Sequence, residues 1–365
     1  MVACPLDEVT AWFRGRRVFP SGQGVDERPG TGFDAVALNS LRSAASPSVP
    51  TAAPVEPTGT VRARPHRIIA VGGGKGGIGK SLVSSNLGVA LAARGQRVLL
   101  VDADLGGANL HTCLGVGQPT ATLSDFLLRP KSRLEDVIVP TGVPNLSLIA
   151  GALDVLDAAN IKYAHKQRLL RSLQTQSVDY LILDLGAGSS FNTLDFFIIA
   201  DHGVLVLLPE PTSVENAYRF VKAAFFRRLQ QVESEYGIER LVERALSTRE
   251  GASRTPLEIV QHVRQTSPTL AAKLEKELAA FRVKLVLNQA RTDADVKVNA
   301  AVVAAWKKFF GLEMDDFGAI RYDDEAWRAV RKRRPIVLDK PDSPSALGIQ
   351  SIADRLLALD GVTSP

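Results

Sequence analysis

One short stretch of the sequence has the residue types and spacing that hold a chain of phosphates. It follows an apolar run, precedes a helix-forming segment and fits the pattern G-x-x-x-x-G-K-[ST]. Glycines let the backbone curl so that its amides face inward, and a helix start adds a positive dipole at the same point. The lysine of the pattern can neutralise the outer phosphates, and the serine can ligate a magnesium ion that they share. The stretch comprises Gly74, Lys75, Gly76, Gly77, Ile78, Gly79, Lys80 and Ser81.

A competing pattern lies within the same residues. Gly72, Gly74 and Gly77 spell G-x-G-x-x-G, and Asp102 ends the next apolar run, as a ribose-binding acid does in a dinucleotide site. A dinucleotide site needs no Lys-Ser pair at the start of the helix, whereas a triphosphate site uses both the cation and the metal ligand. The residues therefore favour a nucleoside triphosphate.

Three aspartates stand where apolar runs end. Asp102 and Asp104 share one side of an extended segment, because alternate residues of a strand point the same way, and Asp184 precedes a glycine-rich turn. Open α/β sheets bind their ligands at the carboxyl ends of the strands. There Asp184 can hold magnesium through water, while the glycines let the loop move with the outermost phosphate. Turn formation or helix capping is the structural alternative for each aspartate.

Five apolar runs rich in Val, Leu and Ile predict the strands that position these residues, and helix-forming segments separate them. Because the runs are continuous rather than alternating, we expect parallel strands that are buried on both faces. The sequence therefore predicts a doubly wound α/β fold, with a mostly parallel sheet and helices on both of its faces. The runs begin at residues 67, 96, 177, 201 and 281.

Two segments differ from this pattern. Residues 1–65 end in a linker rich in Pro, Ser, Thr and Ala, which predicts a disordered N-terminal arm with at most a short helix at 33–42. Residues of about 227–282 are rich in charge and helix formers and predict a helical insertion that offers a docking surface. The remaining residues predict one α/β domain at 66–360, which contains the insertion.

Composition narrows the class of protein. The net charge is +5, which favours weak contact with nucleic acid or anionic lipid without demonstrating either. The chain has only two cysteines, Cys4 and Cys113, so no disulfide framework or four-cysteine zinc site can form within it. No apolar run suits a secretion signal or a membrane span, so we expect a cytoplasmic protein without a transmembrane segment.

The stretch KGGIGKS, in which an extra lysine precedes two glycines, resembles the deviant Walker A box of the MinD/ParA ATPases, which are P-loop NTPases of the SIMIBI type. The resemblance covers about residues 66–358, since VDADLGGANLHTCLG is similar to their first switch and LILDLGAG to their second. LLPEPTSVENAYRFVKA and FGAIRYDDEAWRAVRKRRP are most similar to the flagellar-number regulators FlhG/FleN, relatives of the division-site ATPase MinD. The resemblance implies a slow, partner-stimulated ATPase that positions or counts a cellular structure.

The resemblance also implies roles for the charged residues. Lys75 would reach phosphates across a homodimer that sandwiches ATP, while Lys80 would act within its own subunit. Asp104 would orient the attacking water, and Asp102 and Asp184 would lie near magnesium. Hydrolysis would then release the switches and separate the dimer, so that turnover times the binding of a protein activator or cargo.

The remaining nucleotide contacts are implied in the same way. The resemblance places Ser81 on magnesium, Leu82 at the end of the phosphate-binding box and Asn288 on the adenine. The segment 321–323 would complete the adenine pocket, although Asp323 could instead cap the next helix. ATP and Mg²⁺ are thus the implied ligands.

The sequence leaves open whether the protein binds a membrane or DNA. MinD proteins end in an amphipathic membrane helix, but the tail here carries few cations, so a packed core helix competes with a membrane helix. ParA relatives hold nonspecific DNA with clustered cations, and residues 328–334 are the densest basic run, although such a run also simply ends a helix. The protein could make peripheral contact with the inner membrane or with the nucleoid. The alternative functions are a partition ATPase and a metabolic P-loop enzyme without a dimer switch. The apolar positions of the tail are Ile349, Ile352, Leu356 and Leu357.

Overall fold

The structure is a computed structural model that describes residues 66–104, 106–151, 163–236 and 256–362. The expected N-terminal arm at 1–65, with the short helix expected at 33–42, lies outside the described residues. So does the central part of the expected insertion, from 237 to 255. All the elements described below belong to one unit of the chain.

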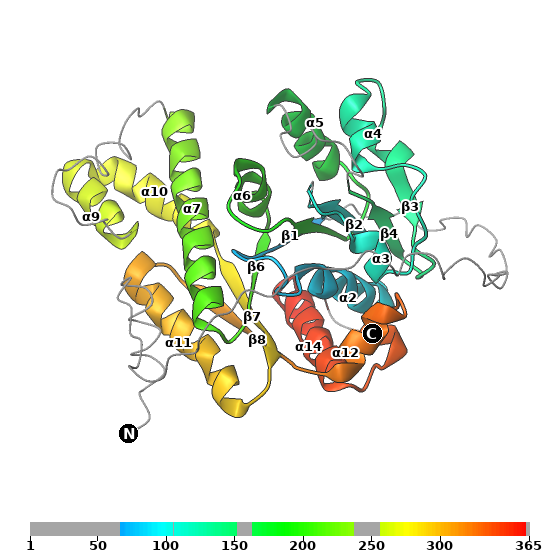
Figure 1. The fold of residues 1–365 in the computed structure, drawn as a ribbon. Coiled ribbons are helices and arrows are strands. Elements are labelled where there is room, and N and C mark those ends of the chain that lie inside the picture. The colour runs from blue at the N-terminus through cyan, green and yellow to red at the C-terminus, as the bar shows by residue number, and fades with distance from the viewer. Residues whose placement is uncertain (1–65, 105, 152–162, 237–255, 363–365) are drawn as a thin grey trace, which may run out of the picture. The chain divides into compact units, whose positions relative to one another are not determined.

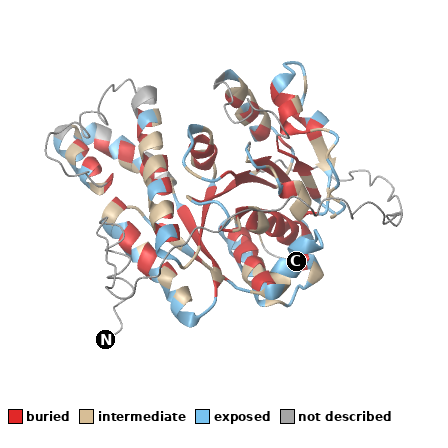
Figure 2. Ribbon diagram, in the orientation of Figure 1, coloured by how far each residue is buried: buried red, intermediate tan, exposed pale blue. Residues whose placement is uncertain are grey.

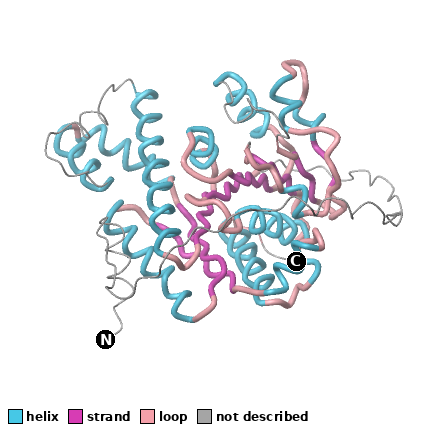
Figure 3. Tube along the Cα trace, viewed as in Figure 1, coloured by secondary structure: helices cyan, strands magenta, loops and turns pink. Residues whose placement is uncertain are grey.

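The described residues form an eight-stranded sheet in the order β3-β4-β2-β5-β1-β6-β7-β8. Figure 3 shows the strands in magenta among the helices in cyan. All neighbouring strands in the sheet are parallel except β3 and β4. The chain builds one side of β1 through β2 and β4 and the other side through β6, β7 and β8, which confirms the predicted doubly wound α/β fold. The strands are β1 (Arg67–Gly72), β2 (Val98–Ala103), β3 (Ile138–Pro140), β4 (Leu146–Ile149), β5 (Tyr180–Leu185), β6 (His202–Leu207), β7 (Val283–Ala290) and β8 (Met314–Arg321).

The five predicted strands are the central ones, and the three that sequence patterning missed lie toward the edges. Every residue of β2, β5 and β6 is buried, as continuous apolar runs require. The strands β3 and β4 have only three and four residues, too few to show a pattern. The edge strand β8 carries Asp315 and Asp316, which make its sequence polar.

Helices cover both faces of the sheet, and their inward sides are buried (Figures 1 and 2). Helices α2, α3, α12, α13 and α14 contribute to one hydrophobic cluster, and α4 to α7 and α9 to α11 contribute to the other. The helices are α2 (Lys80–Ala93), α3 (Leu110–Cys113), α4 (Leu123–Leu128), α5 (Tyr163–Gln174), α6 (Phe191–Ile198), α7 (Pro211–Tyr236), α9 (Pro256–Thr266), α10 (Pro268–Ala280), α11 (Asp293–Phe310), α12 (Asp324–Arg331), α13 (Ile336–Asp339) and α14 (Pro344–Leu359), with a 3₁₀ turn at Leu134–Val137.

The described parts of the expected insertion are helical. Helix α7 runs for 26 residues, and α9 and α10 follow the part that is not described. Helix α9 packs on α10, α7 and α11, with Ile259 and Val263 fully buried. These helices therefore extend the hydrophobic cluster of one sheet face.

The C-terminal helix α14 is a packed core helix. It contacts α2 and β8, and its Asp354 pairs at 2.5 Å with Arg94, the residue that follows α2. The competing expectation of a free membrane helix is wrong, because the apolar face is already covered. Among the described residues, no helix is both long and apolar enough to cross a bilayer. The buried face comprises Ile349, Ile352, Leu356 and Leu357, each at most 1% exposed.

Asp360 follows α14 and ties the end of this helix to the amino ends of three strands. Its carboxylate accepts a hydrogen bond from the Tyr180 hydroxyl at 2.8 Å and lies 3.0 Å from Nε2 of His202. Nε of Arg67, at the start of β1, lies 3.1 Å from the same carboxylate. The start of β1 and the end of α14 therefore meet at the edge of the sheet where these strands begin.

We predict that Leu356→Ala lowers the free energy of unfolding by about 2–5 kcal/mol, because it leaves a cavity between α14, α2 and the sheet. Leu359 of the same helix is 56% exposed, so Leu359→Ala should change the stability by less than about 0.5 kcal/mol. Urea unfolding followed by circular dichroism measures both. Equal effects of the two substitutions would contradict the packing of α14.

Candidate functional site

The glycine-rich loop lies between the carboxyl end of β1 and the start of α2, as predicted. Asp184 of β5 is in register with Val71 of β1 and with Asp102 of β2, so these strands end side by side. Gly79 begins α2 in a left-handed conformation. The loop, Asp102 and Asp184 therefore share one edge of the sheet.

Two glycines of the loop are required by close contacts. A Cβ atom on Gly74 would lie 2.0 Å from the carbonyl oxygen of Asn216 in α7. Gly79 has a φ of +91°, and a Cβ atom there would lie 2.3 Å from Nδ2 of Asn288. The loop is thus fixed between α7 and the end of β7, and its backbone stays free to face a ligand.

Lys80 is the buried cation of the loop. It is only 7% exposed, and its Nζ donates to the carbonyl oxygen of Lys75 at 3.4 Å. Burial lowers the pKa of Lys80, and the charges of Asp184 and Asp104 act in the opposite direction. An ammonium group held among carboxylates at this position suits the outer phosphates of a nucleotide.

Lys75, the additional lysine, points to a different partner. Its Nζ lies 3.7 Å from Oε2 of Glu210, just before α7, and both side chains are about half exposed. This ion pair was not predictable from sequence patterns, because it joins residues 135 positions apart that belong to different motifs. Lys75 is therefore held within its own chain in this structure.

Asp184 is the most enclosed carboxylate of the site. Burial raises its pKa to about 6, against hydrogen bonds from Ser81 and Ser84 and the charge of Lys80. The Ser84 hydroxyl donates to Oδ1 at 2.8 Å. Ser84, one turn after Ser81 on α2, was missed from the sequence because it lies outside the phosphate-loop pattern.

Asp102 holds the loop that follows β2. Its Oδ1 accepts from the backbone amide of Asp104 at 3.2 Å and its Oδ2 from that of Leu110 at 3.0 Å. Burial and then the charge of Asp184 raise its pKa to about 7, against these two hydrogen bonds. Both oxygens thus have backbone donors, so a metal ion nearby would meet this carboxylate through water or through its remaining lone pairs.

Asp104 lies half-buried where the two glycine-rich loops meet. Its Oδ1 accepts from the amide of Gly106 at 3.3 Å, and a Cβ atom on Gly186 would approach that oxygen to 2.9 Å. The segments after β2 and β5 therefore touch at this carboxylate, which explains the glycine at 186.

The oxygen ligands present here fit magnesium. Ser81, Asp184 and Asp102 supply hard oxygen atoms beside the loop, and buried carboxylates with raised pKa values favour a nearby cation. No group of three His, Cys, Asp or Glu side chains in the described ranges could hold a metal ion by itself. This fits an ion that takes its other ligands from phosphates and water.

A cavity of about 320 Å³ adjoins the loop on its other side. Asn288, at the end of β7, donates from Nδ2 to the carbonyl of Ile78 at 2.8 Å, so the expected base-reading residue contacts the loop. Asp323 lines the cavity and also caps α12, because its carboxylate accepts a hydrogen bond from the amide of Glu325 at 2.8 Å. The two alternatives expected for Asp323, a place beside the base and a helix cap, are therefore compatible. The lining comprises Gly79, Leu82, Asn288, Gln289, Ile320, Arg321, Tyr322, Asp323, Ala326, Trp327, Val330 and Ser345.

His111 and Cys113, two residues apart on α3, form no metal site with other described residues. Burial, followed by the charges of Asp184 and Asp102, raises the pKa of Cys113 to about 11. The Cys113 thiol therefore stays protonated at neutral pH.

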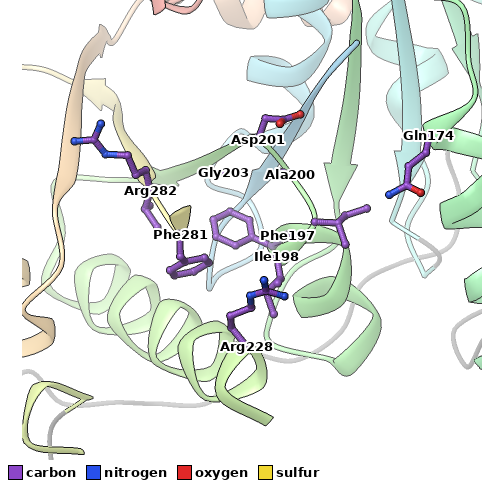
Figure 4. A pocket seen from close by; sticks show the side chains of 11 residues that line it. Gln174, Phe197, Ile198, Ala200, Asp201, Gly203, Arg228, Phe281 and Arg282 are labelled. Carbon is purple, nitrogen blue, oxygen red and sulfur yellow. The ribbon is translucent and has the colours of Figure 1, made fainter. Parts of the chain in front are cut away.

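A separate cavity of about 400 Å³ lies at the amino ends of β6 and β7 (Figure 4). The rings of Phe197 and Phe281 meet edge to face with centroids 6.1 Å apart, and Arg282 points away from them. The charged side chains that line this cavity do not point toward one another. It lies at the other end of the sheet from the loop and has no part in the phosphate site.

We predict that the metal-free protein loses stability as the pH rises from about 4 to about 7. The raised pKa of Asp102 means that the folded state binds a proton which the unfolded state has already released in this window. One such proton gives a slope of about −1.4 kcal/mol per pH unit. Denaturant unfolding of the wild type and Asp102→Asn from pH 5 to 8 should show a shallower slope in the variant, and parallel slopes would contradict the raised pKa.

Comparison with known proteins agrees with this geometry. A family model described as "ParA: NUBPL iron-transfer P-loop NTPase" matches residues 64–232. The antiactivator FleN of Pseudomonas aeruginosa is 29% identical over 294 residues, which are 80% of this chain and 86% of FleN. A putative septum site-determining protein MinD of Oltmannsiellopsis viridis is 32% identical over 292 residues, 80% of this chain and 75% of the relative. The septum site-determining protein MinD of Pyrococcus horikoshii, solved with Mg-ADP, shares the fold with a TM-score of 0.56 at 24% identity, over 81% of this chain and 98% of that one. The chain therefore belongs to the ParA/MinD family of P-loop NTPases.

Proposed function

We propose that the protein is a slow, partner-stimulated ATPase whose ATP-bound homodimer sets the place or number of a cellular structure such as a flagellum or division site. The observation that carries the proposal is the meeting of three parts at one sheet edge. These parts are the glycine loop with buried Lys80, the paired carboxylates, and the contact between Asp104 and the loop after β5. Together they can bind a triphosphate and report the loss of its last phosphate.

Nucleotide binding follows from the two sides of the loop. The backbone amides of residues 74–81 and the ammonium group of Lys80 would hold the phosphates, and the cavity beside Asn288 would take the base. Ser81, Asp184 and Asp102 would hold Mg²⁺, which neutralises charge on the phosphates. Bound nucleotide would have to displace or share the Asn288 contact with Ile78, which couples the base pocket to the loop.

Hydrolysis needs a water molecule in line with the outermost phosphorus. Asp104 is the half-buried carboxylate at the junction of the two loops, so it can accept a hydrogen bond from that water and orient it. Lys80 and a Lys75 from the partner subunit would stabilise charge on the leaving oxygens. Because Asp104 also contacts Gly186, departure of phosphate would free both loops at once.

The ion pair between Lys75 and Glu210 gives the dimer its switch. In the single chain this lysine is occupied by a carboxylate, and in the proposed dimer it would exchange that partner for a phosphate of the other subunit. Both side chains are about half exposed, so the exchange costs little. ATP would then hold two chains together, and its hydrolysis would release them and their activator or cargo.

A partition ATPase that binds nonspecific DNA is the second candidate. The basic run at 328–334 on and after α12 is the observation that favours it. Binding of this kind would weaken steeply with salt, because it rests on phosphate contacts.

We predict that Lys80→Ala weakens ATP binding by about 100-fold or more, because it removes the buried cation of the phosphate site. Asp104→Ala should keep ATP affinity within about threefold and slow hydrolysis by about 100-fold, which traps the dimer. Calorimetry with ATP and Mg²⁺, phosphate release and sedimentation measure the three effects. Equal loss of binding in both variants would remove the role given to Asp104.

We predict that Lys75→Ala still binds ATP but stays monomeric in sedimentation, because the contact across the dimer is lost while Lys80 and the loop amides remain. Glu210→Gln should favour the dimer about two- to fivefold, since it frees Lys75 from an exposed ion pair. Glu215→Gln removes a comparable exposed pair with Arg219 on α7 and serves as the control. A Lys75→Ala protein that dimerises like the wild type would refute the switch.

A further inference from the structure

The cavity beside the glycine-rich loop has apolar walls and several polar residues. A pocket for a flat base needs such walls, together with a few polar groups that match the edge of the base. Leu82 and Ile320 contribute apolar surface, and Trp327, which is 60% exposed, adds an indole that an occupant could cover. The polar residues that line the cavity are Asn288, Gln289, Arg321, Tyr322, Asp323 and Ser345.

Four of these polar side chains are already bonded to protein groups. A side chain held in this way is less able to turn toward a ligand, because its present partner would be left without a hydrogen bond. The bonded pairs are Ser345 with Asp323 at 3.1 Å, Asp323 with the amide of Glu325 at 2.8 Å, Tyr322 with Asp324 at 3.0 Å and Arg321 with Asp293 at 2.5 Å.

Asn288 is occupied at both ends of its side-chain amide. Its Nδ2 donates to the carbonyl oxygen of Ile78 at 2.8 Å, and its Oδ1 accepts from the backbone amide of Gln289 at 2.9 Å. The side chain is buried, with 3% of the residue exposed. Asn288 therefore holds the end of β7 against the loop, and it can keep this contact if a neighbouring residue reads the base.

The strand β7 is irregular at the neighbouring position. Residues 287 and 290 of β7 are in register with residues 319 and 321 of β8, so β7 carries one extra residue between them. Consecutive residues of a regular strand face opposite sides, whereas an extra residue of this kind re-aims a side chain. Asn288 and Gln289 accordingly line the same cavity although they are adjacent in sequence.

Gln289 also has an unfavourable backbone conformation. Its φ is +57°, and the other described residues besides glycine with a positive φ are Asn145 and Arg333. Such strain persists only where the surrounding structure fixes it, and it clusters at ligand sites. The side-chain amide of Gln289 is half-buried and has no hydrogen-bond partner within the described ranges. Its donor and its acceptor are therefore available to a ligand.

We propose that Gln289 sets the specificity for adenine, while Asn288 supports the loop. The inference rests on the proposed function, because it names the residue that reads the base in the same site. The amide oxygen of Gln289 would accept a hydrogen bond from the 6-amino group of adenine, and the amide nitrogen would donate to the adjacent ring nitrogen. This pairing uses both polar groups that the structure leaves unbonded at Gln289.

The test compares ATP with purine riboside triphosphate, which lacks the 6-amino group. Calorimetry with Mg²⁺ on the full chain measures both affinities. In the wild type, loss of the 6-amino group should weaken binding by about five- to tenfold, the effect of one hydrogen bond. In Gln289→Leu, ATP should bind about five- to tenfold more weakly than in the wild type, and the two nucleotides should agree within about twofold. Leucine is similar in size and is also unbranched at Cβ, so the backbone strain stays comparable.

Three further variants separate the reading of the base from the support of the loop. Asn288→Ala removes the contact with Ile78 and should weaken both nucleotides by the same factor, so the preference for ATP remains. Gln289→Glu keeps an accepting oxygen and should also still prefer ATP. Gln118→Leu makes the control change on an exposed residue outside the cavity and should match the wild type. Thermal melting without nucleotide checks that each variant is folded.

The outcomes that would overturn the role of Gln289 differ from those that would overturn nucleotide binding. Equal affinity of the wild type for the two nucleotides would refute the reading of the 6-amino group and leave the proposed function intact. A preference that survives in Gln289→Leu and disappears in Asn288→Ala would assign the base to Asn288. A wild type that binds neither nucleotide would refute the proposed function together with this inference.

Discussion

Two carboxylates are buried at the ends of neighbouring strands, and one buried ammonium group faces them. An ionised carboxylate without such a partner is costly inside a protein, and the raised pKa values of Asp102 and Asp184 express that cost. The site can relieve it in only a few ways: by holding protons, by hydrogen bonds from Ser84 and backbone amides, or by admitting a cation together with phosphates. The glycine-rich loop and the segments that follow β2 and β5 lie around these charges.

The doubly wound sheet makes the arrangement possible. Parallel strands on both sides of β1 bring their carboxyl ends to one edge, so residues far apart in sequence meet there. The contact of Asn288 with Ile78 joins the end of β7 to the loop, and Gly74 packs against α7. The loop therefore contacts both the end of β7 and helix α7, which follows Glu210.

Local patterns in the sequence were enough for the central strands, the phosphate loop and the aspartates that end β2 and β5. Their signals are short-range, because glycine spacing and continuous apolar runs fix backbone shape within a few residues. Contacts that depend on tertiary packing were not visible: the pairing of Lys75 with Glu210, the support of Asp184 by Ser84, and the exposure of Trp327. The short strands β3 and β4 and the polar edge strand β8 carried no periodic pattern. Whether the C-terminal helix packs in the core or binds a membrane depended on its contacts with α2 and β8, which the sequence does not show.

The ion pair between Asp360 and Arg67 bears on how the chain could be reconnected. Because the first strand begins and the last helix ends within one ion pair of each other, a short linker could join these two points and new termini could be opened elsewhere. Circular permutants cut in a surface loop, or grafts of the whole unit into a host protein, would keep the sheet order while changing only where synthesis begins.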